Sequence, residues 1–80
     1  MPQFYISAVA FDPDNDHPLD KGLTEADYWH MLTGTRVQAS PNPGGADWRT
    51  EQTALDGSRW LVLFDYDQGT AVPVTAWKVK

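Results

Sequence analysis

The stretch Arg59-Trp60-Leu61-Val62-Leu63-Phe64-Asp65-Tyr66-Asp67 is the densest apolar run in this 80-residue chain, and it decides the fold. It lies between two turn signals, Asp56-Gly57 before it and Gln68-Gly69 after it. Asp-Gly supplies the positive φ angles that tight hairpin turns need. The run therefore predicts a long strand between two turns, with one face formed by Trp60, Val62, Phe64 and Tyr66.

Strands are expected on both sides of this central strand. Residues 48–54 alternate so that one side carries Trp48, Thr50, Gln52 and Ala54, and their polarity favours an exposed face or a sheet edge. Residues 70–79 form the last strand, in which Pro73 cannot donate a ladder hydrogen bond. Pro73 therefore predicts an edge strand or a bulge. The three segments together make a meander with the 59–67 strand in the middle.

The N-terminal half predicts a strand, a loop and a helix. Residues 4–11 are apolar on both faces, which predicts a strand that is covered on both sides or lies near the sheet centre. Residues 12–22 hold two prolines and a glycine, so no regular element is expected, and Leu19 is expected to face the core. Residues 35–40 are a weaker strand candidate, and residues 41–45 predict a loop.

A short helix is predicted over residues 25–33. Thr24 can accept a hydrogen bond from the backbone of Asp27 as an N-cap, and Asp27 can reach back toward Thr24. Leu23 and Tyr28 are spaced as a hydrophobic staple, and Gly34 is a suitable stop. The buried face is expected to carry Tyr28, Met31 and Leu32.

These elements predict a small α+β fold that forms a single domain over residues 1–80. An N-terminal strand and one short helix packed on a mostly antiparallel sheet lead to the three-strand meander. The chain has no cysteine, and its N-terminus lacks a basic segment followed by a long apolar one, so a cytoplasmic location is expected. Most of the four tryptophans should be core, with Trp77 and Trp48 the best candidates for exposure.

The negative charge of the chain is concentrated in one segment. Residues 12–27 carry six acidic residues and one basic residue, whereas the rest of the chain carries five of each. The whole net charge of −5 therefore falls in this segment. Such a balance opposes direct binding to nucleic acid or to an anionic membrane, because phosphates select for lysine and arginine.

Metal-binding and catalytic motifs are incomplete. The spacing Asp12-x-Asp14-x-Asp16, with Asp20 at the ninth position, resembles a calcium loop only in part. His17 stands where such a loop needs glycine, and Leu23 stands where it needs glutamate. Pro43-Gly44-Gly45 lacks the Lys-Ser/Thr of a phosphate cradle, and no nucleophile motif is present. We therefore expect no enzymatic activity, no cofactor and no resident metal.

The sequence favours a non-enzymatic acidic module that docks on a basic protein, such as an inhibitor from a phage, a mobile element or an immunity system that covers a nucleic-acid-binding surface. Two alternatives stay open: a cation- or ligand-binding domain that uses the acidic loop 12–20 and an exposed tryptophan, and a homodimer formed through an edge strand. The predicted binding residues are Asp12, Asp14, Asp16, Asp20, Glu25, Asp27, Asp65 and Asp67.

Overall fold

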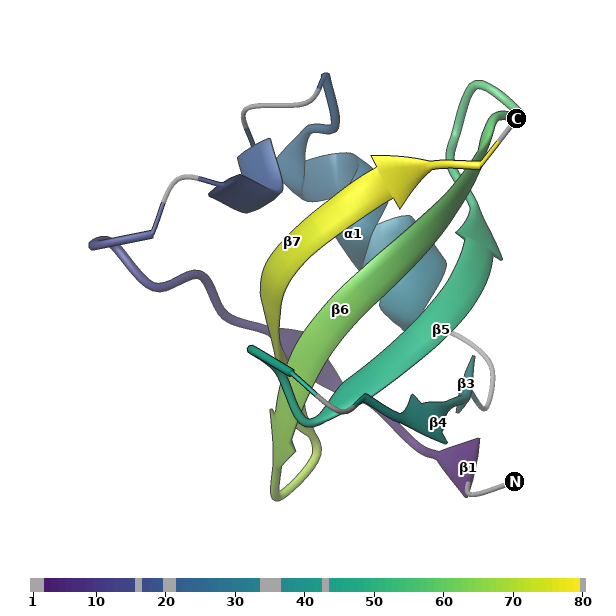
Figure 1. Ribbon diagram of the computed structural model, residues 1–80. Helices are drawn as coiled ribbons and strands as arrows, with labels where there is room; N and C mark the ends of the chain where they lie inside the picture. The colour runs from purple at the N-terminus through teal and green to yellow at the C-terminus, as the bar shows by residue number, and fades with distance from the viewer. Residues whose placement is uncertain (1–2, 16, 20–21, 34–36, 43, 80) are drawn as a thin grey trace.

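The computed structural model describes residues 3–15, 17–19, 22–33, 37–42 and 44–79 and has an α+β fold, as predicted. A five-stranded sheet has the order β2-β7-β6-β5-β4, and β1 and β3 form a two-stranded antiparallel sheet beside it. Helix α1 lies behind strands β5 to β7 in Figure 1. The elements are β1 (Gln3–Phe4), β2 (Ala8–Val9), the 3-10 helix η1 (His17–Leu19), α1 (Glu25–Leu32), β3 (Val37–Gln38), β4 (Ser40–Pro41), β5 (Trp48–Thr53), β6 (Arg59–Asp67) and β7 (Thr70–Lys78).

Strand β6 is the middle of an antiparallel meander, as the sequence predicted. It pairs with β5 on one side and β7 on the other, and it occupies the whole predicted run. Gln68 and Gly69 both have positive φ, 49° and 86°, which a two-residue hairpin turn of this hand requires. Gly57 has a φ of 90° in the turn before β6. Both turn signals in the sequence are therefore confirmed.

Strand β7 carries a bulge at Pro73. The register between β6 and β7 shifts beside Leu63 and leaves Val74 as the extra residue. The carbonyl of Val74 accepts a hydrogen bond from Nδ2 of Asn15 at 3.0 Å. A loop side chain thus satisfies a backbone group that the bulge takes out of the ladder. The bulge prediction is confirmed, and β7 is not an outer strand along its first residues, because β2 pairs there.

The prediction of one strand over residues 4–11, covered on both sides or near the sheet centre, is wrong. This segment is split into β1 and β2, and β2 lies at the edge of the large sheet, parallel to β7. Between them the chain bends around the β6–β7 turn, where the backbone N–H of Ser7 donates to the carbonyl of Gly69 at 2.8 Å. The segment is not covered on both sides either, because Tyr5 is 70% exposed. Phe4 packs in an aromatic cluster, and Ile6 and Val9 are buried in the main core.

Helix α1 begins as predicted, with a complete capping box. Oγ1 of Thr24 accepts from the backbone N–H of Asp27 at 3.2 Å, and the Asp27 carboxylate accepts from the backbone N–H of Thr24 at 2.9 Å. The inward face of the helix is buried, as expected. Gly34, the predicted stop, lies outside the described residues. The core beneath the helix consists of Ile6, Val9, Leu23, Tyr28, Met31, Leu32, Val37, Ala39, Ala54, Trp60, Val62, Phe64, Ala71 and Ala76.

The loop after β2 differs from the prediction in two ways. It contains one regular turn, η1, and the residue that it buries is Pro18, whereas Leu19 is exposed. The reason is the hydroxyl of Tyr28, which donates to the carbonyl of Pro18 and draws that residue into the core. Pro41, predicted as loop, belongs to β4, and the weak strand candidate is divided into β3 and β4.

The exposure of the tryptophans was predicted in part. Trp77 is 47% exposed, as expected. Trp48 is partly buried, because its ring packs edge-on against Phe4 with a centroid distance of 4.7 Å. The second exposed tryptophan is instead Trp29 on the helix, which is 41% exposed.

Candidate functional site

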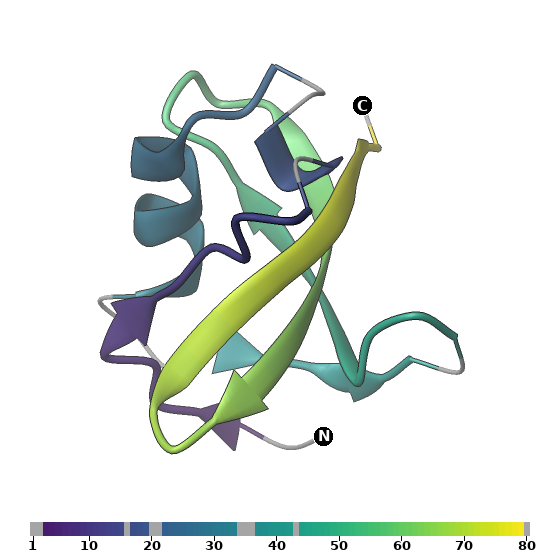
Figure 2. The ribbon, with the colours of Figure 1, turned by 90° about the vertical axis from the view of Figure 1, so that its left-hand side faces the viewer.

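The acidic loop runs along one side of the large sheet. Figure 2 shows the chain after β2 crossing beside β7 to reach η1. Asp12 and Asp14 are exposed there, and Oδ1 of Asp12 accepts from the backbone N–H of Asp14 at 2.9 Å, which holds the loop in a tight turn. Asp16 and Asp20, two further predicted binding residues, lie outside the described residues.

The two acidic residues of the helix N-terminus have different roles. Glu25 is exposed, so its carboxylate is open to solvent. Asp27 is engaged within the chain: besides capping the helix, its Oδ1 accepts from the backbone N–H of Leu55 at 3.2 Å. The backbone hydrogen bond from Thr24, and to a smaller extent the bonds from its hydroxyl and from Leu55, lower the pKa of Asp27. Asp27 therefore ties the helix to the β5–β6 turn.

Asp67 lies apart from the acidic loop, whereas Asp65 pairs with Val72, only two residues from Val74. Asp67 pairs with Thr70, whereas the loop meets β7 at Val74 through Asn15. Four residues of strand separate these points, about 13 Å, which exceeds the Debye length of about 8 Å at physiological salt. Asp65 also has a structural role, because its Oδ1 accepts from the backbone N–H of Asp47 at 2.8 Å.

The cation-binding alternative gains no support from the geometry. Within the described ranges, no three side chains of histidine, aspartate or glutamate come together as a metal site. The two remaining aspartates of the loop are not part of those ranges. Also within the described ranges, no helix has the length and apolar character to cross a membrane.

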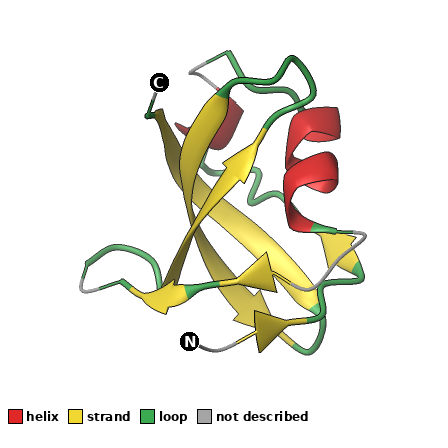
Figure 3. Ribbon diagram, turned by 90° about the vertical axis from the view of Figure 1, so that its right-hand side faces the viewer, coloured by secondary structure: helices red, strands yellow, loops and turns green. Residues whose placement is uncertain are grey.

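A feature that the sequence reasoning missed is a groove on the sheet face that points away from α1. Figure 3 shows the helix on one side of the sheet and the loop after β4 projecting on the other. Leu61 and Leu63 of β6 and Val74 and Trp77 of β7 line this groove, together with Arg49 of β5. The signal was present in the sequence, because two of the three central outward positions of the 59–67 strand are leucines.

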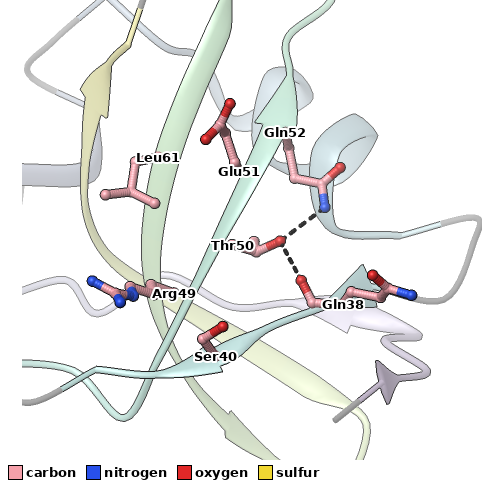
Figure 4. A pocket seen from close by; sticks show the side chains of 7 residues that line it. All are labelled: Gln38, Ser40, Arg49, Thr50, Glu51, Gln52 and Leu61. Carbon is pink, nitrogen blue, oxygen red and sulfur yellow. Dashed lines mark hydrogen bonds between the residues drawn. The ribbon is translucent and has the colours of Figure 1, made fainter. Parts of the chain in front are cut away.

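A second, more polar hollow opens at the edge of β5, shown in Figure 4. Oγ1 of Thr50 donates to the backbone carbonyl of Gln38 at 2.8 Å, and Nε2 of Gln52 donates to Oγ1 of Thr50 at 2.9 Å. The Thr50 bond joins β5 to β3, and the Gln52 bond supports Thr50 from within β5. The hollow shares Arg49 and Leu61 with the apolar groove, so the two form adjoining parts of one surface.

Among the described residues, no strand lies beside part of the β5 edge. The backbone N–H of Ala54 donates to the carbonyl of Ser58 at 2.8 Å, and the alternation of an antiparallel ladder then directs the backbone groups of Glu51 and Thr53 away from β6. In the described part of the chain, β4 pairs only with the first two residues of β5. Homodimer formation through this edge stays a prediction, and sedimentation of the purified protein would test it.

Comparison with known proteins assigns no family: no protein-family model, no curated protein and no solved structure matches this chain. Function is therefore inferred from the residues and their geometry.

Proposed function

We propose that the protein is a non-enzymatic binding module that docks on a basic surface of another protein through its acidic segment. The single observation that carries this proposal is that the entire net charge of −5 falls in residues 12–27. Carboxylates gathered in this way create a local field that accelerates encounter with a lysine- and arginine-rich surface and disfavours acidic partners.

The arrangement of charges in the fold supports this proposal. Asp12, Asp14 and Glu25 expose their side chains on the acidic segment. The basic residues among the described ranges, by contrast, lie on the central strands: Arg49 on β5, Arg59 on β6 and Lys78 on β7. These basic residues belong to elements outside the acidic segment, and the segment itself carries the net negative charge.

The partner class follows from the same charge argument. Large basic surfaces are typical of proteins that bind nucleic acid, because their lysines and arginines neutralise phosphates. An acidic module that covers such a surface would compete with the nucleic acid and act as an inhibitor. Small acidic antagonists of this kind suit a phage, a mobile element or an immunity system.

The proposal is tested by capturing partners on the immobilised protein and measuring the affinity of each purified partner at low and high salt. Docking through carboxylates predicts weaker binding at high salt and competition by duplex DNA or heparin. The double variant Asp12→Asn/Asp14→Asn should weaken binding. Binding that is indifferent to salt and to these two changes would contradict the proposal.

A matched control removes the same charge elsewhere. Asp47→Asn/Glu51→Gln alters one exposed carboxylate just before β5 and one on β5. If the docking surface is the acidic segment, this control should bind nearly as well as the unaltered protein. Equal losses in both variants would mean that net charge, rather than the acidic segment, governs binding.

A further inference from the structure

The outward face of the meander combines apolar and aromatic side chains in register. Leu61 of β6 pairs directly with Trp77 of β7, and Leu63 pairs with Thr75 in the next outward row. The Trp77 ring is 47% exposed although it stands beside two leucines. Exposed tryptophan on an apolar floor is a typical feature of binding surfaces.

The groove over these residues has a shape fixed by the fold. Its volume is about 420 Å³, within the range of roughly 300–1,000 Å³ usual for small-molecule sites. The loop that walls it is held by its own hydrogen bonds: Nδ2 of Asn42 donates to the carbonyl of Ala46 at 3.1 Å. The Asp47–Asp65 hydrogen bond fastens the same loop to β6. The wall is therefore in place before any ligand arrives.

Among the described residues, Arg49 is the one charged side chain that lines this groove. Its guanidinium has no hydrogen-bond or ion-pair partner among the described residues, whereas Arg59 on the same face pairs with Glu51 at 3.0 Å. Arg49 pairs in register with Leu63, so its side chain extends from the sheet next to the apolar floor. A complementary ligand has one anionic group and an apolar body.

We propose that this groove binds a small organic carboxylate with an aliphatic body of medium length, the carboxylate on Arg49 and the body on Leu61, Leu63 and Trp77. The distance from β7 to β5 is two strand spacings, about 10 Å, which a medium-length aliphatic ligand can span. A free ligand is favoured over an extended peptide, because a peptide would add to an open strand edge. The groove floor is instead β6, whose backbone is paired on both sides. This proposal does not depend on the acidic segment.

The test titrates the full chain with decanoate, below its micelle concentration, and follows the indole N–H signals by NMR. We expect saturable shifts at the Trp77 indole and at the amides of Leu61 and Leu63, with the Trp29 indole unmoved. Methyl decanoate, which keeps the body but not the charge, should bind about 1.5- to fivefold more weakly, as expected for an exposed ion pair. Acetate, which keeps only the charge, should not bind.

Variants separate the two parts of the site. Arg49→Gln should bring decanoate down to the affinity of its ester, and Trp77→Ala should weaken both ligands. Arg59→Gln and Trp29→Ala are matched controls outside the groove and should leave binding unchanged. Absence of saturable binding, equal affinity for acid and ester, or an undiminished affinity for decanoate in a folded Arg49→Gln protein would each overturn the proposal.

Discussion

Replacing Tyr28 with phenylalanine removes one oxygen atom from the centre of the molecule and tests how the acidic loop is held. The ring is fully buried, and its hydroxyl donates to the carbonyl of Pro18, which is also buried. Without that donor a buried carbonyl stays unsatisfied, at a cost of about 1–3 kcal/mol. A domain of this size has a stability of about 4–12 kcal/mol, and each kcal/mol shifts its Tm by about 4–8 °C. A loss of about 2 kcal/mol therefore predicts a Tm lower by about 8–16 °C, measured by circular dichroism.

The matched control is Tyr66→Phe. The Tyr66 hydroxyl donates to the carbonyl of Tyr5 at 3.4 Å in an exposed setting, where water can replace it. This control should change the free energy of unfolding by less than about 0.5 kcal/mol. A Tyr28→Phe protein as stable as the Tyr66→Phe protein would refute the reasoning that the hydroxyl draws η1 into the core.

Three further predictions concern the strand, the turn and the cap. Phe64→Ala should lower the free energy of unfolding by about 3–5 kcal/mol in urea titration, because Phe64 is fully buried at the centre of β6; near-normal stability would show that the strand is peripheral. Gly69→Ala should lower the free energy of unfolding by about 1–2 kcal/mol, because the residue has a positive φ. The loss should exceed that of Gly57→Ala, because a Cβ at position 69 would lie 3.1 Å from Ser7 Oγ, whereas a Cβ at position 57 would meet open space. A lower Tm for Gly57→Ala than for Gly69→Ala would contradict this. Hydrogen bonds lower the folded-state pKa of Asp27 below the unfolded value, so the stabilisation that its carboxylate gives to the fold is present above about pH 4 and is lost as pH falls through the folded pKa. Asp27→Asn should therefore lower the free energy of unfolding by about 1 kcal/mol at neutral pH and by less at pH 3. An equal loss at both pH values would argue against this linkage.

The elements that the sequence predicted well are those set by neighbouring residues. The bounds of β6 follow from an apolar run between two turn signals, and the start of α1 follows from Thr24 and Asp27 three residues apart. The bulge at Pro73 follows from a missing backbone donor. In each case the cause and the structure lie within a few residues of each other.

The features that were mispredicted depend on residues far apart in the chain. Nothing near Ala8 indicates that β2 pairs in parallel with Thr70, so the apolar pattern alone predicts one continuous strand that is covered on both sides or central. Leu19 is more apolar than Pro18, but a hydroxyl ten residues away selects Pro18 for the core. The apolar groove combines residues of three strands with a loop, and its leucines alone do not distinguish a binding surface from a covered one.

The pairing of β2 with β7 has a consequence for how the protein is made. Ser7 donates to Gly69 across 62 positions of sequence, and the first strands and the helix leave the ribosome before their partners β6 and β7 exist. During that interval the apolar side chains of residues 4–11 and of α1 have no sheet to cover. Long-range pairings of this kind slow folding and extend the time for which apolar surface is open to aggregation. Nascent chains stalled before residue 59 should therefore be protease-sensitive, whereas chains released at full length should become resistant.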